Sequence, residues 1–297
     1  MHAIDSHLHL WDPGLLDYAW LDGPLRARFA AEELTDAGVG GASPGEAVFV
    51  QAVFVQAECA EEQFLDEARW VAAGAARTGV RGIVAGARLD RGPQTSDHLA
   101  ALDALPLIVG VRHLLQGEPD GHAATPAFVE GAARVAARGW AFDACVRAHQ
   151  LPDVAALAAE LPELRIVLDH LGKPAIGTAA APAAPEARWV RDLRALAAHP
   201  NTFCKLSGLP AEAGGAWDAD QVVPFLDAAA DAFGPDRLMW GSDWPVSALV
   251  AGPDDDVAYR RGERDAWFRT VADWADRRGH DVEALMHGTA ALAYRLS

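Results

Sequence analysis

The sequence predicts a single-domain α/β fold, a (β/α)8 TIM barrel that spans residues 1–297. Eight short apolar segments recur along the chain, and stretches with helical spacing separate most of them, as in consecutive βαβ units. Right-handed crossovers leave two main solutions, an open doubly wound sheet or a closed barrel. Eight units in 297 residues favour the barrel.

The segments expected as strands are apolar and often β-branched, as strands buried in a parallel sheet require. They cover Ala3–His9, Ala47–Gln56, Gly82–Leu89, Leu107–His113, Trp140–Val146, Arg165–His170, Thr202–Leu206 and Arg237–Ser242.

The stretches expected as helices repeat apolar residues with a helical period. In Glu61–Arg77, for example, Phe64, Leu65, Ala68 and Val71 fall at positions i, i+1, i+4 and i+7. The same reading predicts helices over Pro126–Arg138, Pro152–Glu160, Glu186–His199, Gln221–Phe233 and Glu263–Arg278, and a last helix within "DVEALMHGTAALAYRL". Residues 11–45, 177–185 and 251–264 are expected as loops, the first of them an ordered loop near a site.

Composition excludes several classes of function. The formal net charge of −17 and the pI near 4.9 disfavour binding to nucleic acid or to an anionic membrane. No apolar run reaches transmembrane length, and no basic region followed by an apolar stretch marks a secretory signal. Cys59, Cys145 and Cys204 form no CxxC pair and suggest free thiols. We therefore expect a cytoplasmic protein, a monomer or small homo-oligomer, without nucleic-acid or membrane partners.

Polar side chains follow six of the eight expected strands, at the end of a barrel where catalytic groups gather. These residues are His7 and His9, Gln56 and Glu58, Arg112 and His113, Asp169, His170 and Lys173, Lys205 and Ser207, and Ser242 and Asp243.

The strongest subset is His7, His9, His170 and Asp243. In a strand, side chains alternate between faces, so His7 and His9 point the same way. Three neutral imidazoles and a carboxylate suit zinc or a similar ion. The same groups also suit catalysis without metal, in which histidines hydrogen-bond a carbonyl oxygen and Asp243 takes a proton from water.

The stretches "IDSHLHLWDP", "LDHLGKP" and "WGSDWP" resemble the amidohydrolase superfamily, and "YAWL", "GVRHLLQGEPD" and "CKLSGL" resemble its sugar-lactonase branch. That branch includes L-fuconolactonase-like, L-rhamnonolactonase-like and 2-pyrone-4,6-dicarboxylate lactonase-like proteins. The resemblance covers essentially the whole chain. It implies a (β/α)8 barrel that hydrolyses a lactone, with His7 and His9 as the HxH pair, His170 as the strand-six histidine and Asp243 as the water-activating aspartate.

The chain departs from the two-metal members of the superfamily. Those members carry a bridging lysine or glutamate at strand four and a histidine at strand five. Here strand four offers Arg112 and His113, and strand five ends in "CVRAHQ". We therefore expect at most one divalent ion, with zinc preferred, held by His7, His9, His170, Asp243 and Glu58, or catalysis without metal.

Six further residues are candidate substrate contacts, each with a structural alternative. Arg112 and His113 alternate across a strand, so only one of them faces the lumen. The other candidates are Glu58, Lys173, Trp20 and Trp244, which alternatively start a helix, form a salt bridge or pack in loops. Asp169 is expected to be structural and to face away from His170.

The predicted function is hydrolysis of a sugar lactone, such as L-fucono-, L-rhamnono- or L-galactonolactone, to the hydroxy acid. A metal-dependent decarboxylase or amide hydrolase of the same superfamily is the first alternative. A non-catalytic barrel that binds a sugar acid is the second, and the water-activating carboxylate beside three imidazoles argues against it.

Overall fold

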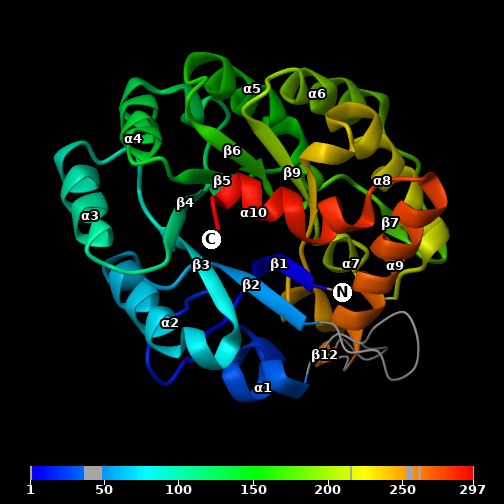
Figure 1. The fold of residues 1–297 in the computed structure, drawn as a ribbon, viewed down its shortest axis with the longest axis horizontal. Helices are drawn as coiled ribbons and strands as arrows, with labels where there is room; N and C mark the ends of the chain where they lie inside the picture. Colours follow the sequence, from blue (N-terminus) through cyan, green and yellow to red (C-terminus); the bar gives the residue numbers. More distant parts are fainter. Residues whose placement is uncertain (1, 37–48, 215, 252–256, 260–261, 297) are drawn as a thin grey trace.

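The computed structural model describes residues 2–36, 49–214, 216–251, 257–259 and 262–296, and these form a (β/α)8 barrel (Figure 1). Within them, eight parallel strands make one sheet in the order β1-β2-β3-β4-β5-β6-β9-β10. Its strands are β1 (His2–Leu8), β2 (Phe49–Val55), β3 (Val80–Gly86), β4 (Ile108–Leu114), β5 (Ala141–Cys145), β6 (Arg165–Leu168), β9 (Thr202–Leu206) and β10 (Leu238–Trp240). The predicted fold class is confirmed.

Helices surround the sheet and cover its outer face (Figure 1). The α-helices are α1 (Ala31–Asp36), α2 (Phe64–Thr78), α3 (Pro93–Asp103), α4 (Pro126–Ala137), α5 (Leu151–Glu160), α6 (Ala187–Ala197), α7 (Leu209–Glu212), α8 (Ala219–Phe233), α9 (Glu263–Arg278) and α10 (Thr289–Tyr294). Short 3₁₀ turns are η1 (Gly23–Arg26), η2 (Glu61–Gln63), η3 (Leu115–Gly117), η4 (His122–Ala124), η5 (Ala148–Gln150), η6 (Asp169–Gly172), η7 (Pro235–Arg237) and η8 (Val246–Ala248), and η9 (Ala284–Gly288) is a π-helical turn.

Every expected strand and helix has a counterpart, and most bounds differ by one to three residues. Helices α1, α3 and α7 are additional to the prediction. The expected loop over 177–185 contains the antiparallel pair β7 (Gly177–Thr178) and β8 (Ala181–Pro182). A second antiparallel pair, β11 (Leu249–Ala251) and β12 (Val257–Tyr259), begins just before the expected loop over 251–264. Residues 47 and 48 of the second expected strand, and parts of the first and last expected loops, lie outside the described residues.

The first and last strands close the barrel. The Ser6 hydroxyl donates to the carbonyl of Trp240 over 2.7 Å. Beyond β10, the amide of Asp243 donates to the carbonyl of His7 over 2.8 Å, and the amide of His9 donates to the carbonyl of Trp244 over 2.8 Å. These bonds hold the segments that carry His7, His9 and Asp243 side by side.

A register shift in β1 turns His7 into the lumen. The pairing with β2 is regular from His2 to Asp5 and shifts before Leu8. Ile4 packs in the lumen core, whereas Asp5 bonds to Arg264 of the outer helix α9. Strict alternation from Ile4 would point His7 outward, so the irregularity is what brings His7 inside.

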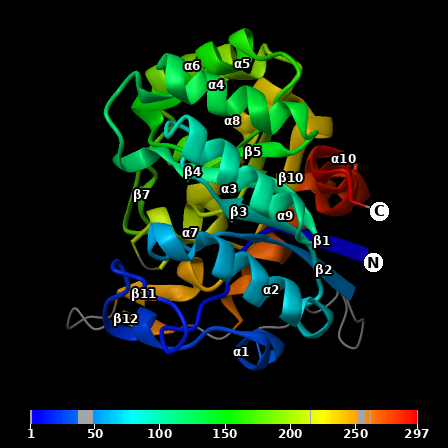
Figure 2. The ribbon, with the colours of Figure 1, turned by 90° about the vertical axis from the view of Figure 1, so that its left-hand side faces the viewer.

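The C-terminal segment covers the N-terminal end of the barrel, where α10 lies across the strands (Figure 1). Figure 2 shows the two chain ends on this side and the hairpin strands β7, β11 and β12 toward the opposite side. Tyr294 of α10 is buried in the lumen core, and its hydroxyl lies 2.9 Å from both carboxylate oxygens of Asp143. One end of the barrel is therefore plugged, and chemistry is confined to the other end.

All three cysteines are free and buried. Among the helices that the structure describes, none has the length and apolar character needed to cross a bilayer.

Glu67 of α2 is a buried carboxyl that ties two loops to the helix. Its Oε1 atom accepts from the amide of Ala57 over 3.1 Å and from the hydroxyl of Tyr18 over 3.4 Å. Burial raises the pKa of Glu67 to about 7. An unfolded glutamate has a pKa of about 4.3, so the folded protein binds the extra proton between these two values.

Because the folded state holds more protons there, the free energy of unfolding should fall as pH rises from about 4.3 to about 7. Glu67→Gln keeps an oxygen acceptor and removes the charge, so at pH 8 it should be more stable than wild type by about 1–3 kcal/mol. Urea unfolding at pH 5 and pH 8 measures this. Glu62→Gln, at an exposed position, is the control and should follow the wild-type curve. An equal difference between Glu67→Gln and wild type at both pH values would contradict the assignment.

Candidate active site

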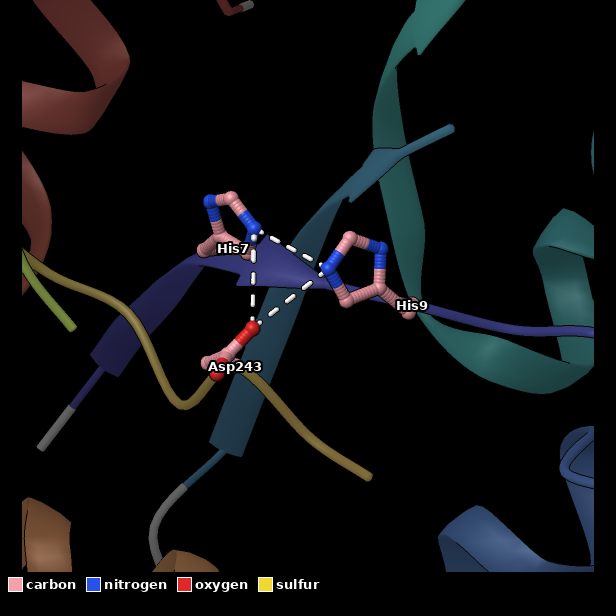
Figure 3. A group of neighbouring side chains, drawn as sticks. All are labelled: His7, His9 and Asp243. Atoms are coloured by element: carbon pink, nitrogen blue, oxygen red, sulfur yellow. Dashed lines mark hydrogen bonds and ion pairs between the residues drawn. The ribbon is translucent and has the colours of Figure 1, made fainter. Parts of the chain in front are cut away.

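His7, His9 and Asp243 converge at the C-terminal end of the barrel (Figure 3). The Nε2 atoms of the two histidines are 3.1 Å apart. The Oδ1 atom of Asp243 lies 3.4 Å from Nε2 of His9 and 3.7 Å from Nε2 of His7. All three residues are at most 5% exposed.

His170 joins this group from the loop after β6. Its Nε2 atom lies 3.7 Å from Oδ1 of Asp243, and its Nδ1 atom is 2.9 Å from the hydroxyl of Ser207. His170 has a φ of 55°, in the left-handed region that non-glycine residues rarely adopt. A Cβ at Gly208 would come within 2.4 Å of the His170 ring, so the glycine leaves room for the imidazole.

Burial keeps His7 and His170 neutral. It lowers the pKa of His170 to about 4 and lowers the pKa of His7 well below its usual value. Burial alone would raise the pKa of Asp243, but His170, His9 and His7 outweigh it and bring that pKa below its usual range. Near neutral pH the site therefore holds the carboxylate of Asp243 beside the neutral imidazoles of His7 and His170.

Asp243 is held by groups on its own loop. The hydroxyl of Ser247 donates to Oδ2 over 2.8 Å, which leaves Oδ1 to face the histidines. Asp243 also has a positive φ, 56°, at the turn that follows β10. Strained residues of this kind are common at functional sites, where the surrounding contacts fix them.

Asp5 positions both sides of the cluster. Its Oδ1 atom accepts from the amides of Ser242 over 2.8 Å and His7 over 3.2 Å. Its Oδ2 atom accepts from the hydroxyl of Ser242 over 2.6 Å and from the guanidinium of Arg264 over 2.9 Å. Asp5 is fully buried, so this carboxylate fixes the backbone of β1 against the loop that carries Asp243.

A line of charged groups lies beneath the histidines. Nζ of Lys205 is 2.5 Å from Oδ2 of Asp143, 2.9 Å from Oδ1 of Asp169 and 3.1 Å from Nδ1 of His7. Sequence reasoning placed Lys205 among the polar residues at the strand ends without giving it a role, and it did not single out Asp5 or Asp143. The available signal was a charged residue inside a short apolar strand, as in "AFDAC" and "TFCKL".

The expectation that Asp169 faces away from His170 is wrong. Ligand atoms of His7, Asp169 and His170 all lie within 4.8 Å of one another. Burial would raise the pKa of Asp169, but Lys205 and His7 hold it well below its usual range. The left-handed turn η6 follows β6 here, so strand alternation does not extend from Asp169 to His170.

Arg112 and His113 point to opposite sides of β4. Arg112 reaches the carbonyl of Gln56, and its Nη1 atom lies 3.4 Å from Oδ2 of Asp169, so it faces the lumen. His113 packs outside the strand against Phe128, and its Nδ1 accepts from the amide of Leu89 over 3.2 Å. The structure does not bring His113 to the cluster.

The remaining candidates lie around or away from the cluster. Glu58 accepts from the side chains of Gln56 and Arg88 and belongs to neither group of potential ligands at the cluster. Lys173 donates to Gln116 and lowers the pKa of His170, so it lies near the cluster. Trp20 is 39% exposed and donates to the carbonyl of Ala57.

Trp244 is only 1% exposed and packs edge-on against Phe29. Its ring belongs to the hydrophobic core, because the loop after β10 pairs with β1 and turns this side chain inward. The structure therefore does not present Trp244 to a bound sugar.

The donor atoms of the cluster fit a small divalent cation. Ligands at about 2.0–2.2 Å from a tetrahedral zinc ion lie roughly 3.3–3.5 Å from one another. The separations within His7, His9 and Asp243 run from 3.1 to 3.7 Å, and His170 stands 3.7 Å from the same carboxylate oxygen. Imidazole nitrogens and a carboxylate are ligands that zinc accepts.

Comparison with known proteins gives consistent matches over the whole chain. The model of the Amidohydrolase family matches residues 4–296. An L-fucono-1,5-lactonase of Burkholderia multivorans is 37% identical over 307 residues, which cover 99% of this chain and 96% of that protein. An L-fucono-1,5-lactonase of Burkholderia ambifaria is 34% identical and covers 99% of this chain and 95% of that protein. A crystal structure of a Burkholderia multivorans amidohydrolase with bound zinc aligns with a TM-score of 0.80 at 33% identity, over 100% of both chains.

Proposed function

This chain belongs to the amidohydrolase family, and from that premise we propose that it hydrolyses a sugar lactone to the open hydroxy acid. The observation that carries the proposal is the convergence of Asp243 with His7, His9 and His170 at the open end of the barrel. The similarity to two L-fucono-1,5-lactonases supports aldono-1,5-lactones of the L-fucose configuration as the first substrates to test.

In the reaction that we propose, the carboxylate of Asp243 takes a proton from a water molecule as the water oxygen bonds to the lactone carbonyl carbon. The C–O bond to the ring oxygen then breaks, and the protonated Asp243 returns the proton to that oxygen. The products are one carboxyl group and one hydroxyl group. Ser247 keeps the second oxygen of Asp243 occupied, so one oxygen serves both proton transfers.

An imidazole N–H from His7, His9 or His170 would stabilise the negative charge that develops on the carbonyl oxygen. A divalent ion held by His7, His9 and Asp243 would add Lewis-acid polarisation of the same oxygen. The fit of the donor atoms and the zinc bound in a similar structure support zinc as that ion.

Arg112 is suited to a polar group of the substrate. Its side chain is 5% exposed, and among the described residues no group hydrogen-bonds its Nε atom. A buried guanidinium N–H without a partner is costly, and a sugar hydroxyl or the product carboxylate would satisfy it. Lys173 supplies a second cation nearby.

Three buried free thiols support a reducing compartment such as the cytoplasm, and the substrate class supports a place in carbohydrate metabolism.

A panel of aldono-1,4- and 1,5-lactones tests the proposal, with acid release followed by a pH indicator in zinc-supplemented and in chelator-treated protein. We expect fast turnover of one stereochemical group of lactones, well above spontaneous hydrolysis. The control substrates are a carboxylated phenol and an aryl amide, which the decarboxylase and amidase alternatives would consume. Turnover of a control substrate without acid release from any lactone would overturn the proposal.

A further inference from the structure

Lys205 is a buried ammonium that makes direct contact with a candidate metal ligand. Its side chain is fully buried in the lumen, and its Nζ atom lies 3.1 Å from Nδ1 of His7 with hydrogen-bond geometry. The other neighbours of Nζ are the carboxylates of Asp143 and Asp169. An ammonium group has three N–H donors and no acceptor, so it can only donate to the imidazole.

This contact determines where His7 carries its proton. A neutral imidazole has one N–H, and the nitrogen that accepts from Lys205 must be the unprotonated one. The proton of His7 is then on Nε2, which faces Nε2 of His9 at 3.1 Å. His9 is ready to accept it, because its own Nδ1 must donate to the carbonyl of Val55 over 2.8 Å.

Metal binding needs the opposite tautomer. His7 can bind an ion through Nε2 only when that nitrogen offers a lone pair, so the proton must move to Nδ1. Nδ1 then needs an acceptor, and Oδ1 of Asp169 lies 3.2 Å away. That oxygen is buried and forms an ion pair with Nζ of Lys205 over 2.9 Å, but no hydrogen bond reaches it from the residues that the structure describes. Lys205 and Asp169 therefore compete for the same nitrogen, and in this structure the hydrogen bond goes to Lys205.

We propose that Lys205 is a positioning residue that holds His7 in the Nε2–H tautomer and thereby weakens zinc binding at the His7, His9 and Asp243 cluster. Zinc binding requires His7 to exchange Lys205 for Asp169 as the partner of Nδ1. In the metal-free arrangement, the same Nε2–H is a donor that a lactone carbonyl can use directly. This proposal deepens the metal-binding part of the proposed function. Its statement about zinc affinity rests on that part, whereas its statement about the His7 tautomer does not.

The tautomer can be read without metal or substrate, so the test is independent of lactone hydrolysis. Side-chain ¹⁵N chemical shifts of histidine distinguish a protonated nitrogen from an unprotonated one. In chelator-treated, ¹⁵N-histidine-labelled wild type, we expect the Nε2–H form of His7, assigned by the signal lost in His7→Gln. In Lys205→Met, we expect the Nδ1–H form, because Asp169 becomes the remaining partner.

Zinc affinity, measured by competition with a fluorescent chelator, gives the second readout. Partners of metal ligands typically change affinity by about 10–100-fold, so Lys205→Met should bind zinc at least about tenfold more tightly than wild type. Tyr294→Phe is the matched control. It removes the hydroxyl that donates to Asp143 at the far end of the same buried chain and leaves Nζ at His7. In Tyr294→Phe, the His7 tautomer should match that in wild type. The zinc affinity of this variant should stay within about twofold of the wild-type affinity, a smaller change than loss of a direct partner of His7 brings.

Loss of the ammonium leaves the carboxylates of Asp143 and Asp169 without their shared cation. The double variant Lys205→Met/Asp143→Asn removes one of these charges and provides a second protein if the single variant does not fold. The Nδ1–H tautomer in metal-free wild type would overturn the proposal. An unchanged His7 tautomer in both variants would also overturn it, even if zinc bound more tightly, because loss of a nearby positive charge alone favours a cation.

Discussion

Asp243→Asn should lower kcat for lactone hydrolysis by at least about 10²-fold, the scale of a lost general acid–base group. Asparagine has nearly the same shape and still offers an oxygen to the hydroxyl of Ser247, so the loop should keep its conformation. An amide cannot accept a proton from water or return one to the leaving ring oxygen. Steady-state kinetics on the best lactone of the panel measures the change.

Asp66→Asn is the control for this variant. Asp66 is 59% exposed and pairs with Arg69 on the outer surface of α2, so its amide should leave kcat unchanged. Circular dichroism and thermal unfolding establish that Asp243→Asn is folded. Turnover by folded Asp243→Asn within a few-fold of wild type would remove Asp243 from the proton-transfer role.

Asp5→Ala should lower the free energy of unfolding by about 3–5 kcal/mol, the cost of removing one partner of a buried ion pair. The substitution leaves the guanidinium of Arg264 buried without this carboxylate and removes the acceptor for the amides of His7 and Ser242. The midpoint of urea unfolding at constant m-value measures the loss. Because Asp5 fixes two strands that carry the cluster, kcat should fall as well.

Asp66→Ala provides the comparison for stability. An exposed ion pair contributes about 0–1 kcal/mol, so this variant should unfold close to the wild-type midpoint. Equal losses for Asp5→Ala and Asp66→Ala would show that the buried carboxylate does not hold the barrel closed.

Periodicity in the sequence was sufficient to predict the barrel. Strands buried on both faces read as short apolar runs, and the helices around them must turn one apolar stripe inward. The helix α3 was not predicted, because its buried residues, Thr95, Leu99 and Leu102, are few and one of them is polar. The small hairpins lie in polar stretches that carry no such pattern.

The convergence of the four central candidate residues was predictable because strand ends meet at one end of a barrel. Their orientation was not predictable in the same way. The alternation of side chains along β4 explains why Arg112 and His113 face opposite sides of the strand. The same alternation, counted along β1 from Ile4 in the lumen, would place His7 on the wrong side. The register shift in β1 and the left-handed turn at His170 depend on pairing with other strands and on contacts such as that with Gly208.

The buried charged groups next to His7 could not be predicted from the sequence either. Asp143 lies on β5, Lys205 on β9 and Asp169 in the turn η6 after β6, and each alone is an ordinary polar residue in a sequence. Only the folded barrel shows that they neutralise one another and reach Nδ1 of His7. A buried charge is tolerated where opposite charges compensate it, so these residues depend on one another.

The most direct test of the central claim is acid release from L-fucono-1,5-lactone by the wild-type protein, followed in a pH-stat beside Asp243→Asn from a parallel preparation. The account predicts hydrolysis far above the spontaneous rate for wild type and a loss of at least about 10²-fold in the variant. If folded wild-type protein, with and without added zinc, released no acid from this lactone or from any other aldonolactone, the assignment of the cluster to lactone hydrolysis would be contradicted.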